Sequence, residues 1–268
     1  MKKKLPILLS VIALLCGTLP LRSQTDTVRV VDYTHLFGIG GVNILDTYLS
    51  PLEYTGRQVS TLHLTERTLR PDSRWTLSAR YGGDLGRAMS PTEDGKYWDA
   101  NLYAAAKVRR VWQPAPSFSL AGGPMAEIFL GGTYSQRNGN NPAQGRVGAT
   151  IGMSGKAAYN FRLWRRDWRA VVVLDVPLVG LAFTPAYGQS YYEIFELGHR
   201  DRNVRPTWIG NAPSALLTAQ IEVPLGRAAL VAGYQADIRQ HKLAGLKRHG
   251  WSNRFIVGWT RRLQILKR

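Results

Sequence analysis

The clearest pattern in this chain is an alternation of polar and apolar residues, which is strongest between Ser214 and Leu263. In the segment that begins at Ser214, one phase carries Gln220 and Glu222, and the other carries leucine, alanine, isoleucine and valine. A period of two is typical of a β-strand whose two faces meet different surroundings. The short joint at 224–227 then predicts a hairpin to the next alternating segment.

Similar segments occur along the whole chain and predict about ten strands, within a range of about eight to twelve. The expected strands are 37–45, 58–67, 75–84, 98–108, 118–128, 147–161, 168–178, 214–223, 227–239 and 254–260. Short connections are expected at 69–74, 112–117, 163–167 and 224–227, and longer ones near 46–57, 85–97, 135–146, 179–213 and 240–250. This alternation predicts an all-β, antiparallel up-and-down transmembrane barrel with short periplasmic turns and long external loops.

Aromatic residues indicate which face of the strands points outward. They fall in the apolar phase and gather at the two ends of the predicted strands, as in the aromatic girdles of membrane barrels. The expected girdle residues are Trp75, Phe118, Phe161, Trp168 and Trp259 at the end with short turns, and Trp98 and Trp251 at the end with long loops. The alternative is a soluble barrel or sandwich, which would bury the apolar face instead.

If the apolar face meets lipid, the polar phase fills the interior of the barrel, and it is rich in both acids and bases. The expected lumenal charged network consists of Arg80, Asp84, Asp99, Lys107, Glu127, Lys156, Arg169, Asp175, Glu222, Asp237, Arg239 and Arg254. Paired charges can fill a narrow barrel while satisfying each other, which is a structural role. A pathway for a small solute or a lumenal binding site are the alternatives.

The N-terminus has the features of a secretory signal peptide, which we place at residues 1–23, leaving a barrel domain at 24–268. Three lysines precede an apolar run at 5–15, and this run is too short to span a bilayer as a helix. The only cysteine, Cys16, lies in this segment, so the mature chain has no disulfide framework and no thiolate metal site. Leu15 stands before Cys16, where a lipoprotein signal needs a small residue.

The net charge of the chain indicates which kinds of molecule it is expected to bind. Removal of residues 1–23 takes away four basic residues and no acid, so the formal net charge falls from +17 to +13. With a signal peptide and no nucleic-acid motif, we expect anionic lipid and lipopolysaccharide as partners, other outer-membrane proteins as a further class of partner, and no nucleic acid. The basic residues of the predicted loops could contact lipid phosphates or form a solvated surface: His199, Arg200, Arg202, Arg205, Lys242, Lys247 and Arg248.

The longest predicted loop holds the best candidates for a plug or a binding site, because long loops in compact domains tend to be functional. These candidates are Tyr187, Ser190, Tyr191, Tyr192, Glu193, Phe195 and His199. Tyr192, Phe195 and Tyr191 are expected on the buried side of a short helix that plugs or caps the barrel mouth. The catalytic alternative uses Ser190 as nucleophile and His199 as base, with Glu193 or Glu196 as the orienting acid.

A second catalytic alternative compares the chain with outer-membrane proteases, which activate water with acids and a histidine at the barrel rim. It requires Asp84, Asp237 and His241 to converge, although no Asp-x-Asp pair is present at the top of a strand. The five histidines, His35, His63, His199, His241 and His249, have no metal-site spacing and are expected in loops or the lumen. We therefore expect no metal and no cofactor.

Two stretches of the chain carry a family resemblance: Asp46-Thr47-Tyr48-Leu49-Ser50-Pro51-Leu52-Glu53-Tyr54-Thr55-Gly56 and Pro185-Ala186-Tyr187-Gly188-Gln189-Ser190-Tyr191-Tyr192-Glu193-Ile194-Phe195. They resemble an uncharacterised family of Gram-negative outer-membrane barrels that carries a domain of unknown function. Leu197-Gly198-His199 and the closing hairpins agree with it. The resemblance implies a barrel at the outer membrane and implies no reaction. The chain departs from the usual barrel ending, because it runs past Trp259 to Arg268 without a terminal Phe or Tyr.

Together these observations predict an outer-membrane barrel with a structural, ligand-binding or narrow-pathway role and no evident catalytic centre. Two alternatives remain open at this point. One is a surface hydrolase that acts on lipid acyl chains or peptides, and the other is a non-catalytic subunit of a larger outer-membrane assembly.

Overall fold

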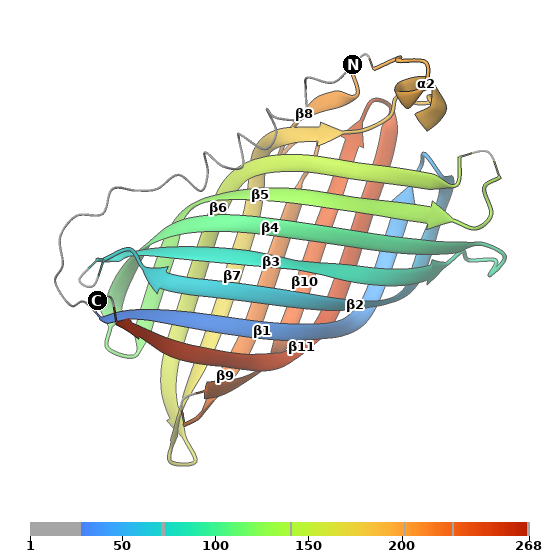
Figure 1. The fold of residues 1–268 in the computed structure, drawn as a ribbon. Helices are drawn as coiled ribbons and strands as arrows, with labels where there is room; N and C mark the ends of the chain where they lie inside the picture. Colours follow the sequence, from blue (N-terminus) through green and yellow to red (C-terminus); the bar gives the residue numbers. More distant parts are fainter. Residues whose placement is uncertain (1–27, 71–72, 140, 201, 227, 267–268) are drawn as a thin grey trace.

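The computed structural model describes residues 28–70, 73–139, 141–200, 202–226 and 228–266, and these form a closed antiparallel β-barrel (Figure 1). The predicted signal peptide and Cys16 lie outside the described residues. The strands are β1 (Val28–Asp46), β2 (Ser50–Thr68), β3 (Trp75–Met89), β4 (Lys96–Ala115), β5 (Phe118–Ser135), β6 (Ala143–Leu163), β7 (Arg166–Phe183), β8 (Val204–Trp208), β9 (Ser214–Leu225), β10 (Ala228–Leu243) and β11 (Leu246–Leu266).

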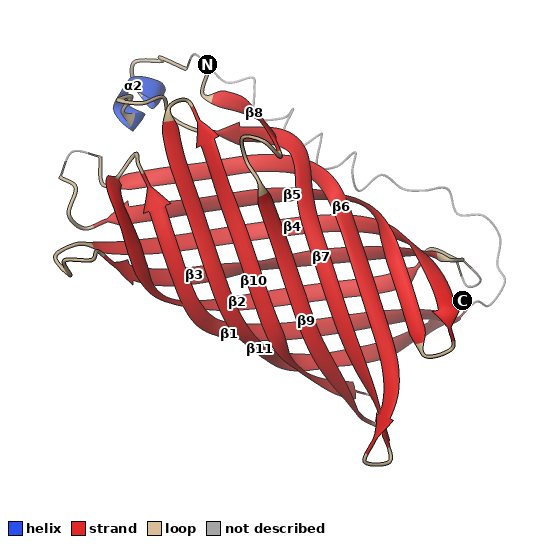
Figure 2. Cartoon of the chain, turned by 180° about the vertical axis from the view of Figure 1, so that it is seen from behind, coloured by secondary structure: helices blue, strands red, loops and turns tan. Residues whose placement is uncertain are grey.

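Ten of these strands make the wall, as predicted. Neighbours follow the chain from β1 to β7 and then from β9 to β11, and the pairing of β11 with β1 closes the ring. We call the end with the β2–β3, β4–β5, β6–β7 and β9–β10 connections the turn end, and the opposite end the loop end. Figure 2 shows the strand wall from behind, with the short helix α2 (Tyr191–Phe195) at the loop end.

The strands are longer than predicted and extend into stretches that we expected to be loops. The loop predicted at 46–57 is wrong, because β2 begins at Ser50, directly after a tight turn. The loop predicted at 240–250 is also wrong, because β10 continues to Leu243 and β11 begins at Leu246. Polar residues in these stretches reflect strands that continue past the apolar band, and not irregular backbone. No helix in the described ranges is long and apolar enough to cross a membrane.

The wall is interrupted at the position next to β7. The loop-end part of β7 pairs with β8 from Val179 to Phe183, whereas its turn-end part pairs with β9 from Arg169 to Asp175. Between β8 and β9 the chain leaves the wall, and Asn211 holds this excursion because its Oδ1 accepts the Trp208 N–H at 2.7 Å. The position next to β7 in the ring is therefore divided between two short strands, β8 and β9.

Most strands place their apolar phase outward and their polar phase in the lumen, as expected. The clearest exception is β2, where Leu62 points inward and is 3% exposed, together with Leu64. Their neighbours Thr61 and His63 face outward. Leu62 packs in a lumenal cluster whose other buried members are Leu36, Tyr103, Val231 and Ile256. The inversion gives the lumen an apolar layer that simple alternation did not predict.

A second apolar cluster fills the lumen near the loop end. Its centre is a stacked pair of tyrosines, Tyr54 and Tyr97, with ring centroids 3.6 Å apart and an interplanar angle of 5°. Val42, Ile44, Leu49 and Ala88 complete the buried part of the cluster, and Tyr48 packs against it. The lumen is therefore filled by apolar side chains immediately below the loop end.

Candidate functional site

The centre of the lumen is an ion-pair network built around one carboxylate. Glu127 on β5 accepts a hydrogen bond from Arg80 on β3, and its Oε1 lies 2.7 Å from Arg239 Nη1 on β10. Glu127 and Arg80 are each 2% exposed. Isolated charges this deeply buried would be very costly, so the pairing compensates for their removal from water.

Three further ion pairs extend the network along the barrel. Arg254 bridges two acids, lying 3.4 Å from Asp84 and 3.3 Å from Asp237. On another side of the lumen, Lys107 Nζ lies 2.5 Å from Asp175 Oδ2. All twelve residues of the expected lumenal network take part in ion pairs in the described chain.

Near the loop end the network contains residues that sequence reasoning missed. Asp99 lies 2.7 Å from Arg146 Nη2 and 3.6 Å from Arg248 Nη2, and Arg248 also approaches Asp46 at 3.6 Å. Arg146, Arg248 and Asp46 stood in or at the edges of predicted loops, so they were not assigned to a lumenal phase. The expectation that Arg248 belongs to a basic loop surface is wrong, because it is buried in the lumen.

Near the turn end a single carboxylate meets two cations. Lys156 Nζ lies 2.6 Å from Glu66 Oε1, and Arg109 donates to Glu66 Oε2. The pair between Arg169 and Glu222 is looser, at 3.7 Å. Glu66 was missed because it follows Leu64 in the phase of β2 that was expected to face outward. Arg109 was missed because the strand predicted at 98–108 ends before it.

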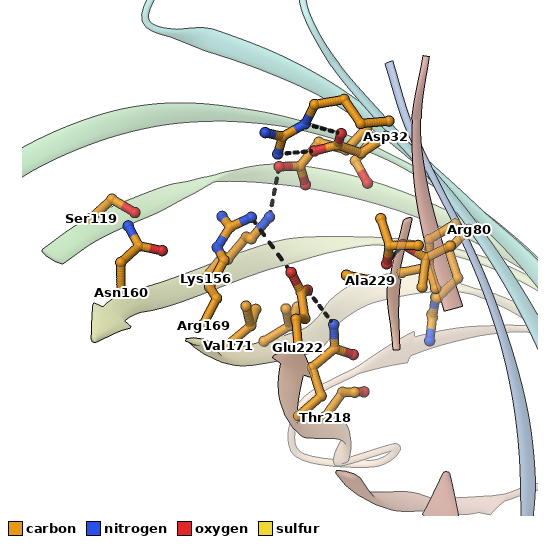
Figure 3. A pocket seen from close by; sticks show the side chains of 18 of the residues that line it. Asp32, Arg80, Ser119, Lys156, Asn160, Arg169, Val171, Thr218, Glu222 and Ala229 are labelled. Atoms are coloured by element: carbon orange, nitrogen blue, oxygen red, sulfur yellow. Dashed lines mark hydrogen bonds and ion pairs between the residues drawn. The ribbon is translucent and has the colours of Figure 1, made fainter. Parts of the chain in front are cut away.

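These turn-end residues line a cavity of about 1230 Å³. Figure 3 shows Lys156, Arg169 and Glu222 close together on its wall, with Val171 beside them. Trp168 and Arg262 line it close to the ends of their strands, so the cavity reaches the turn end. A much smaller cavity, of about 100 Å³, lies in the lumen closer to the loop end, next to the interruption between β8 and β9.

At the loop end, Ser190 caps the N-terminus of the short helix α2. Its hydroxyl accepts the Glu193 N–H at 3.2 Å, while the Glu193 carboxylate accepts the Ser190 N–H at 2.7 Å, which makes a capping box at the start of α2. This N–H and the Ser190 hydroxyl lower the pKa of Glu193. The Ser-x-x-Glu spacing was visible in the sequence and is the signal that predicts such a cap.

The segment around α2 lies over the barrel mouth and contacts both sides of it. The Tyr191 hydroxyl accepts the Gly145 N–H of β6 at 2.6 Å, and the Tyr48 hydroxyl donates to the Gln189 carbonyl at 3.1 Å. Tyr48 stands in the β1–β2 turn, five strand positions from β6 in the ring of ten. Burial raises the pKa of Tyr48 to about 12, with smaller contributions from Tyr191 and Asp46.

The buried side of α2 differs from the expected one. Ile194 is its buried residue, at 1% exposed, and Tyr191 is partly buried. Tyr192 and Phe195 are exposed, so the expectation that they form the buried side is wrong. They lie on the outer side of the cap, where Phe195 stacks on Phe183 with ring centroids 6.4 Å apart. Tyr187 is also exposed.

Neither catalytic arrangement assembles in the described chain. His199 uses its backbone to contact Glu193 and Gln189, and no hydrogen bond joins its ring to Ser190. Asp84 and Asp237 do converge, but Arg254 lies between them and pairs with both. His241 lines the small cavity with the two acids without a hydrogen bond to either. Within the described residues no cluster of three or more potential ligands could hold a metal ion.

Two histidines lie on the outer face of the wall, which corrects the expectation that they are loop or lumen residues. His35 Nδ1 on β1 lies 2.6 Å from His63 Nδ1 on β2, and His63 Nε2 lies 3.0 Å from Thr61 Oγ1. The rings lie beside Trp259 and Tyr81. Among the remaining expected girdle residues, Trp75, Trp98 and Trp251 are exposed, whereas Phe118, Phe161 and Trp168 are partly exposed. Trp168 also lines the turn-end cavity.

The fold and filled lumen define a closed, ten-stranded antiparallel barrel that resembles outer-membrane barrels. The chain belongs to the DUF3316 family, described as a protein of unknown function, whose model matches residues 7–268. No curated protein matches the sequence.

Three solved structures illustrate the likeness. The outer-membrane protease OmpT from Escherichia coli is 7% identical, with a TM-score of 0.51 over 91% of this chain and 99% of that one. The translocator domain of the autotransporter NalP from Neisseria meningitidis is 12% identical, with a TM-score of 0.40 over 90% of each chain. An outer-membrane channel from Pseudomonas putida F1 is 9% identical, with a TM-score of 0.38 over 92% of this chain and 100% of that one. At these identities the OmpT likeness shows the fold alone.

Proposed function

We propose that this protein is a non-conducting outer-membrane barrel with a structural and binding role. The observation that supports this proposal is the set of ion pairs that cross the lumen. Glu127 on β5 pairs with Arg239 on β10, and Arg80 on β3 approaches Asp175 on β7 at 3.8 Å. In the ring of ten, each of these pairs joins strands four positions apart. Side chains that meet across the barrel occupy the path that a solute would take.

Two further layers support a closed barrel. Towards the loop end the stacked Tyr54–Tyr97 pair and its apolar neighbours fill the lumen. Above them the α2 segment is tied to the β1–β2 turn through Tyr48 and to β6 through Tyr191. Narrow barrels fill their interiors with side chains, whereas wide porins leave an aqueous channel. The larger space that remains is the cavity of about 1230 Å³ at the turn end.

The outer surface supports a place in the outer membrane. Large apolar residues are exposed on most strands, including Leu102, Ile128 and Ile151, which are each at least 60% exposed. Such a band is unfavourable in water but suits a lipid bilayer. Exposed tryptophans lie at both ends of it, with Trp75 at the turn end and Trp98 at the loop end.

The same proposal makes lipopolysaccharide the lipid partner at the loop end. Exposed Lys242 and Lys247 stand at the β10–β11 turn, and exposed Arg202 lies just before β8. Cations at this level can pair with lipid phosphates by charge-assisted contacts. The exposed rings of Tyr192, Phe195 and Trp208 suit the boundary between lipid tails and head groups.

Membrane fractionation followed by planar-bilayer recording tests this proposal. We expect the protein in the outer-membrane fraction, a band that shifts when the sample is boiled, and no stable conductance after insertion. Recovery as a soluble periplasmic protein would exclude the membrane location. A steady ohmic current from heat-modifiable wild-type protein would show an open path and would exclude the non-conducting role.

A further inference from the structure

The cavity at the turn end has charges and apolar walls arranged in layers. Nearest the turn end lies a charged layer. Its residues are Asp32, Glu66, Arg109, Lys156, Asp167, Arg169, Glu222 and Arg262. The next inward positions on two strands are apolar, and these strands face each other across the ring. On β2 they are Leu64 and Leu62, and on β7 they are Val171 and Val173. The central ion pairs form the floor.

The charged layer favours an anion over a cation. The whole cavity wall, with its floor, carries six cations and five carboxylates, and one carboxylate, Glu66, is shared by Arg109 and Lys156. Buried side-chain atoms without a hydrogen-bond partner include Arg109 Nε and Arg169 Nε in this layer, and Arg80 Nε and Nη1 at the floor. All of these unpartnered atoms of the cavity wall are donors. Buried donors require acceptors, and an anionic group supplies them.

We propose that the turn-end cavity binds a small amphiphilic organic anion. Its charged group, a carboxylate or a phosphate monoester, accepts hydrogen bonds from Arg109, Lys156 and Arg169. Its short alkyl part lies between the leucines of β2 and the valines of β7. The volume of about 1230 Å³ is ample for such a molecule. A cavity lined by hydrophobic side chains with a few converging polar groups is the usual form of a small-molecule site.

Arg262, at the rim, is 62% exposed and paired with Asp32. Apart from Arg262, the accessible cations of this layer are Lys156 and Arg169, whose side chains are 16% and 30% exposed. Arg109 is 3% exposed and lies behind them. An anion that passes the rim therefore meets Lys156 and Arg169 and reaches Arg109 through the donor that Glu66 leaves unused. Replacement of either accessible cation should weaken binding without removing the carboxylate partner of Arg109.

Isothermal titration calorimetry on the folded full chain in a neutral detergent tests the proposal. The probes are hexyl phosphate, hexanoate, inorganic phosphate and hexyltrimethylammonium. We expect saturable binding of hexyl phosphate or hexanoate, about tenfold or more weaker binding of inorganic phosphate, and no binding of the ammonium. Higher salt should weaken the anion binding. Hexyl phosphate against hexanoate separates the two possible head groups.

Variants assign the binding to this cavity. Lys156→Gln and Arg169→Gln should each lower the affinity for the anion by about tenfold or more, because each removes a charge-assisted hydrogen bond. Arg110→Gln is the matched control, since Arg110 is exposed on the outer face of the same end of β4 and should leave the affinity unchanged. Val173→Thr should reduce the advantage of hexyl phosphate over inorganic phosphate.

Several results would overturn the proposal. They are absence of saturable anion binding by wild-type protein, binding of the ammonium as tight as that of the anions, and equal affinity for inorganic and hexyl phosphate. An equal loss in Arg110→Gln and Lys156→Gln would also overturn it. The wild-type probe series decides the question even if a lumenal variant does not fold, and the heat-modifiable band reports folding of each variant.

Discussion

Glu127 on β5 and Arg239 on β10 meet across the lumen, with Glu127 Oε1 2.7 Å from Arg239 Nη1. The same carboxylate also accepts from Arg80 on β3, so one acid joins three strands through the interior. Hydrogen bonds of the wall join only adjacent strands, whereas these contacts join strands that are not neighbours. Glu127 is therefore one of the buried carboxylates that hold the barrel together from within.

Replacement of Glu127 should be costly for stability. Glu127→Ala leaves Arg80 and Arg239 with less compensation in a buried site, and loss of one partner of a buried pair costs about 3–5 kcal/mol. Asp32→Ala is the control, because its partner Arg262 is 62% exposed, and an exposed pair contributes about 0–1 kcal/mol. Urea unfolding of detergent-folded protein measures both. Similar losses in the two variants would contradict a central role for Glu127.

Acid should loosen the cap over the barrel mouth. The pKa of Glu193 in the folded chain is lowered from its ordinary value of 4.5, first by the Ser190 N–H and then by the Ser190 hydroxyl. A lowered pKa stabilises the folded cap above pH 4.5, and this stabilisation is lost as the pH falls from 4.5 through the lower folded value.

Hydrogen exchange of the α2 amides, corrected for intrinsic rates, measures this loss. Protection at neutral pH should decline in that acid window, and Glu193→Gln should show lower protection with little pH dependence. Glu196→Gln is the control, because it removes a carboxylate from the same segment that accepts nothing from Ser190. If the protection of the wild-type α2 amides does not change with pH in this acid window, the capping box does not stabilise this helix as predicted.

Alkali should release the same cap from its other side. Burial raises the pKa of Tyr48 from 10.0 to about 12, so the folded state favours the neutral phenol that donates to Gln189. The stabilisation is complete below pH 10.0 and is lost as the pH rises towards about 12. Spectrophotometric titration of wild-type protein should show late-ionising tyrosines, and Tyr48→Phe should show one fewer. A late phase of unchanged amplitude in Tyr48→Phe would contradict the prediction.

Alternation of residue types predicted the inward side of most strands, and therefore which charges enter the lumen. Arg80, Glu127 and Arg239 each occupy the polar phase of a recognisable strand. Their pairing was not predictable, because it depends on which strands face each other across the closed ring. Residues at strand ends, such as Arg146 and Arg248, were missed because polar stretches were taken for loops.

The phase of β2 shows the limit of this reasoning. Leu62 and Leu64 are the apolar residues of this strand, yet they pack inside with Leu36 and Val231. Thr61 and His63 face outward, where the His35–His63 hydrogen bond satisfies two ring nitrogens. A pattern read strand by strand assumes that the lumen is polar throughout. The structure instead has an apolar lumenal layer, and the turn-end cavity owes its hydrophobic walls to it.

The interruption between β8 and β9 gives the barrel a preferred place to open. Leu178 of β7 has no partner in the pairings with β6, β8 or β9, and its neighbour Pro177 has no N–H to donate. Regions with few backbone hydrogen bonds open locally at low free energy. We expect the β7 amides from Val176 to Val179 to exchange faster than those from Val171 to Leu174, as measured by mass spectrometry. Uniform protection along β7 would contradict this expectation. Rupture of the ring would then begin at one interface between strands, while the other nine interfaces stay hydrogen-bonded.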